Sequence, residues 1–118
     1  MPDQTVEVTF DPHAEPQFTF VPDTVTMTRA GLIVFHRRPQ NAPWKFKGGS
    51  VKGDAGQFPA SVIGNGSGLR MEDKFTDKEK TYHQYRVIVA FEDHEDPYTS
   101  PDPVIVNDPG TGVVPPKS

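Results

Sequence analysis

The sequence predicts an all-β fold, a Greek-key β-sandwich of about seven to nine strands. Short runs rich in Val, Ile, Phe and Thr alternate apolar with polar residues, which is the period of a strand with one buried face. The thirteen Pro and ten Gly cluster between these runs, where they predict turns. No run has the apolar spacing of a helix long enough to bury one face.

The expected strands differ in how clearly they are patterned. Val6 and Val8 alternate with polar residues in the first run, which we expect to be an outer strand, whereas residues 32–35 are apolar on both faces and predict a central strand. Asn65-Gly66 predicts a hairpin turn, and residues 72–80 allow a single helical turn. In chain order the expected strands cover residues 5–10, 17–20, 24–28, 32–35, 44–47, 57–63, 82–92 and 104–106.

The length and composition indicate one domain. A chain of 118 residues is long enough for one hydrophobic core and too short to divide easily. Only 34% of the residues are hydrophobic, but eight Phe, three Tyr and one Trp predict a thin core rich in aromatic rings. We expect residues 1–107 to form the sandwich and residues 108–118, with two Gly and three Pro, to form a disordered tail.

The charge and the missing cysteines exclude several functions. The net charge of −4 argues against binding of double-stranded nucleic acid or an anionic membrane surface through a global basic field. Without Cys the chain cannot build a disulfide, a thiolate nucleophile or a thiolate-bound metal, and we expect no cofactor. Without an apolar leader or spanning segment we expect a cytoplasmic protein, although a processed secreted protein would look the same.

Two parts of the chain resemble the cupredoxin family. Residues 20–35 begin Phe-Val-Pro, continue through Val25, Met27 and Gly31, and end Leu-Ile-Val-Phe, as in the opening strands of that family. Residues 80–85 and 104–106 are similar to its last two strands. The resemblance implies a Greek-key sandwich, and an immunoglobulin-like sandwich fits the strand count nearly as well.

The family's copper chemistry does not carry over to this sequence. A blue-copper site needs a Cys thiolate and two His, and the chain has no Cys. Trp44 stands where the family places its first His ligand. The resemblance therefore implies a sandwich whose metal end has been lost or rebuilt.

One group of residues combines basic with aromatic side chains. It consists of Arg37, Arg38, Trp44, Lys45, Phe46 and Lys47. An exposed Trp with flanking cations is a common way to hold single-stranded nucleic acid or an anionic sugar, which makes this group a candidate ligand site. The alternative is structural, because Trp44 and Phe46 alternate with the two lysines and would share the buried face of a strand.

Two loops carry residues that could bind a metal ion. Asp11, His13 and Glu15 alternate along one loop, and the acidic segment 92–96 contains Asp93 and His94. If the two loops meet in space, His13, Glu15, Asp93 and His94 would form a candidate metal site, since hard cations prefer loops rich in oxygen ligands. The alternatives are a turn capped by Asp11 and a charged, solvated hairpin tip.

The sequence contains no catalytic motif to which we assign a role. We therefore expect a non-enzymatic module that binds another protein or a second copy of itself through its loops or an open sheet edge. One alternative is binding of a small ligand or carbohydrate by Trp44 with Arg37 and Arg38. The other is a metal-binding protein or metal-dependent enzyme that uses His13, His94 and the nearby carboxylates.

Overall fold

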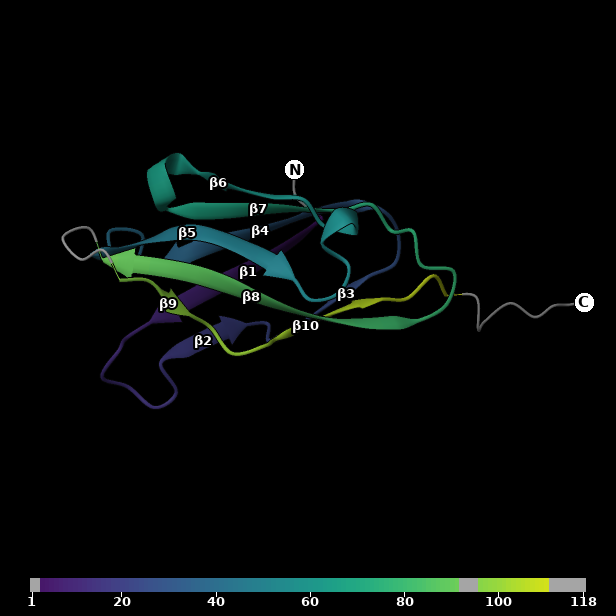
Figure 1. Cartoon of the computed structure of the whole chain (residues 1–118). Coiled ribbons are helices and arrows are strands. Elements are labelled where there is room, and N and C mark those ends of the chain that lie inside the picture. The colour runs from purple at the N-terminus through teal and green to yellow at the C-terminus, as the bar shows by residue number, and fades with distance from the viewer. Residues whose placement is uncertain (1–2, 92–95, 111–118) are drawn as a thin grey trace, which may run out of the picture.

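The computed structural model describes residues 3–91 and 96–110, and these residues are almost entirely β. Two mixed sheets pack face to face as a sandwich (Figure 1), which confirms the predicted fold class. The described residues contain ten strands, slightly more than expected. The Greek-key connectivity and the limits of the sandwich stay predictions, and residues 111–118 of the predicted tail lie outside the described residues.

The first sheet is built around two parallel strands, β1 and β4, which pair along most of their length. Its other pairings, β1 with β2, β4 with β7 and β7 with β6, are antiparallel. From edge to edge the sheet contains β2 (Phe18–Val21), β1 (Gln4–Phe10), β4 (Gly31–Arg38), β7 (Gly68–Asp73) and β6 (Ala60–Ile63).

The position of β1 corrects one prediction. We expected an outer strand, but β1 lies between β2 and β4 and pairs with both. Alternation along a strand indicates that one of its faces is buried. It does not indicate whether one or both edges of the strand pair with neighbouring strands. The central position predicted for residues 32–35 is confirmed, because β4 is the middle strand of this sheet.

The second sheet depends on β8, its longest strand. From edge to edge it contains β3 (Thr24–Met27), β10 (Val104–Asn107), β8 (Thr81–Phe91) and β5 (Trp44–Val51). β8 pairs with β10 through residues 81–84, and the short strand β9 (Tyr98–Thr99) pairs with it at Ile88 and Val89. In Figure 1 β8 is the green arrow that runs along the sandwich from one end to the other.

Three local features differ from the sequence expectation or refine it. β5 continues beyond Lys47, with a change of register between Phe46 and Gly48. The described loop 74–80 contains no helical turn, and the short 3₁₀ segments are instead η1 (Ala55–Gln57) and η2 (Gly64–Gly66). The predicted hairpin turn at Asn65-Gly66 is confirmed, because η2 joins the antiparallel strands β6 and β7.

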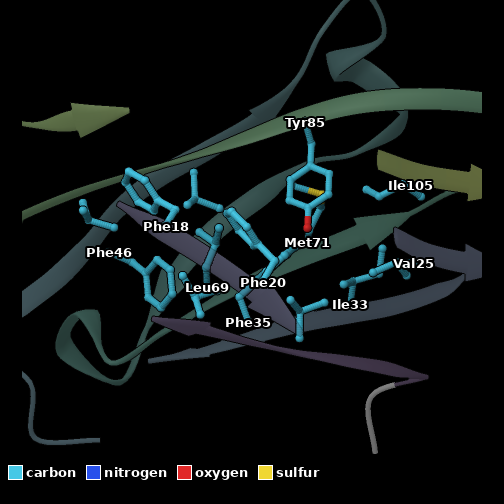
Figure 2. Packing of buried hydrophobic residues seen from close by; sticks show 14 of the residues in the cluster. Phe18, Phe20, Val25, Ile33, Phe35, Phe46, Leu69, Met71, Tyr85 and Ile105 are labelled. Atoms are coloured by element: carbon cyan, nitrogen blue, oxygen red, sulfur yellow. The ribbon is translucent and has the colours of Figure 1, made fainter. Parts of the chain in front are cut away.

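The core is rich in aromatic rings, as the composition predicts. Tyr85 on β8 reaches across to the first sheet, where its ring lies 5.4 Å from the Phe35 ring and 6.0 Å from the Phe20 ring. All three side chains are buried. Figure 2 shows the Tyr85 hydroxyl pointing into this apolar cluster, and the oxygen has no hydrogen-bond partner among the described residues.

No helix among residues 3–91 and 96–110 combines the length and the apolar character needed to cross a lipid bilayer.

The unpaired hydroxyl of Tyr85 leads to a stability prediction. Desolvation of this oxygen costs free energy that no hydrogen bond returns, and burial raises the pKa of the phenol. Tyr85→Phe should therefore leave the free energy of unfolding unchanged or raise it by about 1 kcal/mol, as measured by urea denaturation. Tyr82→Phe, at an exposed position, is the control and should change nothing. A loss of more than about 1 kcal/mol in Tyr85→Phe would contradict the unpaired hydroxyl.

Candidate functional site

A cavity of about 860 Å³ lies at the end of the sandwich where β8 finishes. We call it the Trp44 pocket. Its walls come from the last residues of β1 and β8, the start of β5, β9, and the loops after β1 and β4. The lining residues are Thr9, Phe10, Asp11, Pro12, His13, Arg38, Pro39, Ala42, Pro43, Trp44, Phe91 and Tyr98.

Aromatic rings from four strands form the body of the pocket. Phe10 is central, since its ring centre lies 6.1 Å from that of Trp44, 5.8 Å from that of Phe91 and 4.9 Å from that of Tyr98. Trp44 and Phe91 are register partners in the second sheet, which places both rings at the same end of it. A wall of rings on paired strands is a rigid apolar surface.

Arg37 holds the loop between β4 and β5 in place. Its guanidinium donates to the backbone oxygen of Trp44 at 2.8 Å and also to that of Gln40. The loop closes on itself through the Ala42 amide, which donates to the Pro39 oxygen at 3.0 Å. Arg37 therefore acts on the shape of the pocket by fixing a loop that lines it.

Arg38 and His13 bring charge and polarity to the pocket. Arg38 forms an ion pair with Glu7 at 2.8 Å, and both side chains are close to half exposed. His13 is exposed, and its amide donates to the Asp11 carboxylate at 2.9 Å. The turn cap expected of Asp11 is thus present in the structure.

The residues of the predicted ligand site fall into separate places. Trp44 is only 2% exposed, so its ring faces are covered and the open stacking surface that sugar or nucleic-acid binding requires is not formed. Arg38 and Trp44 line the Trp44 pocket, whereas Lys45 and Lys47 line a shallower hollow against η2. The structural alternative, with Trp44 and Phe46 on the buried face, describes this strand.

The predicted metal site is only partly described. His13 lines the Trp44 pocket, while Glu15 is an exposed loop residue that does not line it. Asp93 and His94 lie outside the described residues. Among the residues that the structure describes, His13 and Glu15 do not belong to a group of three side chains with metal-binding geometry.

A second group of polar residues, which sequence reasoning missed, lies near the start of β8. We call it the Asn107 cluster. It consists of Asp54, Gln57, Asp73, Asp77, His83 and Asn107. Thr81 and Phe91 are ten residue steps apart along an extended strand, or roughly 33 Å, so this cluster and the Trp44 pocket lie at opposite ends of the sandwich.

Asn107 is the centre of this cluster. Its side-chain nitrogen lies 2.9 Å from an Asp77 oxygen, 3.0 Å from Gln57 Oε1 and 3.1 Å from an Asp73 oxygen. His83 adds a contact of 2.7 Å between its Nε2 and the same Asp77 oxygen. Asn107 thereby joins η1, β7, the loop after β7 and β10.

Asp73, which is buried, and Asp77, which is partly exposed, respond differently to their surroundings. Burial raises the pKa of Asp73, and the hydrogen bonds from Asn107 and the Phe75 amide offset this only in part. Burial acts in the same direction on Asp77, but its hydrogen bonds with His83 and Asn107 outweigh that effect and hold the pKa of Asp77 below its ordinary value. Asp73 is thus the carboxyl group whose charge is less well compensated.

Strand periodicity could have predicted that two residues of this cluster are buried. Asp73 follows Leu69 and Met71 on the buried face of β7, and His83 precedes Tyr85 on the buried face of β8. Extending the alternation by one step would have placed both polar residues inside. No sequence signal indicated that these two strand ends lie beside Asn107, since that is a result of how the sheets pack.

Fluorescence can test the burial of Trp44, because this residue is the only tryptophan of the chain. The native protein should emit at short wavelength and resist quenching by iodide, since the indole is 2% exposed. Unfolding in guanidinium should shift the emission to longer wavelength and restore quenching. Long-wavelength emission from the native protein, quenched by iodide, would show that the ring faces are open to solvent.

Comparison with known proteins places the chain in a family. No curated protein matches the sequence. No cupredoxin family is found either, so the resemblance of residues 20–35 to cupredoxins is unconfirmed. The profile of the DP-EP family matches residues 2–109, nearly the whole chain, and the protein therefore belongs to the DP-EP family.

Proposed function

We propose that this protein is a non-enzymatic binding module and that the Trp44 pocket receives a small organic ligand. The observation that carries the proposal is a cavity of about 860 Å³, which is within the usual range for small-molecule sites. Its walls are mainly apolar and aromatic, with few polar side chains, as is typical of such sites.

The geometry favours a ligand with a flat apolar body over a carbohydrate. Sugars stack on the open face of an aromatic ring, and the faces of Trp44 are covered. Phe91 and Tyr98 line the pocket and are only partly buried. Arg38 and His13 offer the polar contacts that orient a ligand with a polar or anionic end.

An aromatic dye tests this proposal. We expect 8-anilinonaphthalene-1-sulfonate to bind the native protein at one site, with energy transfer from Trp44 in the pocket wall. About twenty non-hydrogen atoms at about 0.3 kcal/mol each give a dissociation constant on the order of 10⁻⁵ M. Ala42→Phe fills the pocket with an aromatic side chain and should weaken binding by about tenfold or more, as measured by fluorescence titration.

The matched control is Ala30→Phe, the same substitution in an exposed turn outside the pocket. It should bind the dye as the wild type does. Far-UV circular dichroism and a cooperative melt establish that each variant is folded, since loosely folded states also bind this dye. Absence of binding to the folded wild type, or equal binding by both variants, would contradict a ligand site in the Trp44 pocket.

A second candidate function, self-association, is favoured by the outer strand β6. All four of its residues are exposed, and two of them, Val62 and Ile63, are β-branched and apolar. β6 pairs with β7 on one side and is the edge of the first sheet on the other. An exposed apolar edge strand is a template for pairing with a strand of a second copy.

Self-association through β6 predicts a dimer that one substitution abolishes. The wild type should shift from monomer toward dimer between ~10 µM and ~1 mM in sedimentation velocity, the range expected of a weak interface. Val62→Lys places a charge on the β6 edge and should keep the protein monomeric. Val21→Lys, the same substitution on the other outer strand β2, should dimerise like the wild type. A wild type that remains monomeric throughout would rule out this function.

A further inference from the structure

The Asn107 cluster contains a group of side chains with the geometry of a metal site. One ligand atom from each of Asp54, Asp77 and His83 can be chosen so that all three lie within 4.8 Å of one another. Asp54 and Asp77 are partly exposed and His83 is buried, so the group opens to solvent on the side of the carboxylates. None of these residues belongs to the Trp44 pocket.

Two buried atoms beside this group lack partners. Asp73 is fully buried, and its Oδ2 accepts no hydrogen bond from the described residues. Asn107 is equally buried, and its Oδ1 has no partner either. The other Asp73 oxygen lies 3.1 Å from the same Asn107 nitrogen that contacts Asp77, so the carboxyl group of Asp73 is directed into the cluster.

Two acceptors of the cluster have no donor among the described residues. The Asn107 amide nitrogen has two hydrogens and faces three oxygens within 3.1 Å. Each of these oxygens has a second contact, with the Phe75 amide, the Thr76 amide or His83 Nε2, whereas Asp73 Oδ2 and Asn107 Oδ1 have none. Buried acceptors that are not satisfied cost free energy, and carboxylates cost the most. A cation bound in this cluster would offset the negative charge of the carboxylates.

Charge leads to the same inference. The cluster contains Asp54, Asp73 and Asp77 and a single imidazole, His83. Within residues 3–91 and 96–110 the only ion pair that any of these aspartates forms is the one between Asp77 and His83. The cluster therefore has an excess of negative charge that a divalent cation would neutralise.

We propose that Asp54, Asp77 and His83 bind a divalent transition-metal ion, Zn²⁺ or Mn²⁺. An imidazole with carboxylates suits borderline ions of this kind, whereas Ca²⁺ takes oxygen ligands only and copper(I) prefers sulfur. His83 Nε2 already lies 2.7 Å from an Asp77 oxygen, so an imidazole and a carboxylate ligand stand side by side.

Neighbouring residues hold the ligands in position. Gln57 donates to the Asp54 carboxylate at 2.6 Å, and Asn107 donates to that of Asp77 at 2.9 Å. The Phe58 ring packs edge-on against the His83 ring, with centres 4.9 Å apart. Such supporting contacts orient metal ligands and raise metal affinity.

Titration of the untagged, metal-free full chain with ZnCl₂ and with MnCl₂ tests this site by calorimetry. We expect one ion per chain with a micromolar or lower dissociation constant for at least one of the two metals. Asp54→Asn should weaken binding by about tenfold or more, since loss of a ligand costs at least as much as loss of a supporting contact. Asp54 is partly exposed, so this variant should fold even if His83→Gln does not.

His13→Ala is the matched control, because it removes a histidine at the other end of the sandwich. It should bind the metal with unchanged affinity. Added metal should also shift the His83 imidazole signals in a ¹H–¹⁵N spectrum and leave the His13 signals in place. No binding at 1 mM of either metal, or binding that His13→Ala abolishes and Asp54→Asn leaves intact, would overturn the proposal.

Discussion

β8 is the element on which both ends of this sandwich depend. It runs for eleven residues, pairs with β5 along one edge, and pairs with β10 and then β9 along the other. Tyr85 in its middle packs against rings of the first sheet and ties the two layers together. Because a strand this long is held rigid by pairing and packing, its two ends place functional groups at fixed and well separated positions.

The two ends differ in chemistry because the side chains on the buried face of β8 are aromatic and apolar at one end and polar at the other. At Phe91 the face meets Trp44 and Phe10, and the rings leave an apolar cavity between them. At His83 the face meets Asp77, and the nearby end of β10 adds Asn107. A binding site for an apolar ligand and a site for a cation need opposite surroundings, and the length of β8 keeps the two proposed sites apart.

The Asn107 cluster also closes its end of the sandwich. Its hydrogen bonds tie η1 and the loop after β7 to β10, segments that pair in no common sheet. Apolar packing cannot fix such irregular segments as specifically as directional hydrogen bonds do. The partnerless oxygens of Asp73 and Asn107 fit a cluster arranged for a ligand better than one that serves only to hold loops.

The sequence by itself determined the fold class and the aromatic core, because period-two alternation is a local property of each strand. It gave the burial of Trp44 only as one of two alternatives. Only the tertiary structure decided which residues meet. It placed His13 beside Trp44 and Arg38, separated these from Lys45 and Lys47, and gathered Asp54, Asp77 and His83. The order of strands in a sheet and the packing of two sheets bring distant residues together. Alternation along a single strand encodes neither the strand order nor the sheet packing.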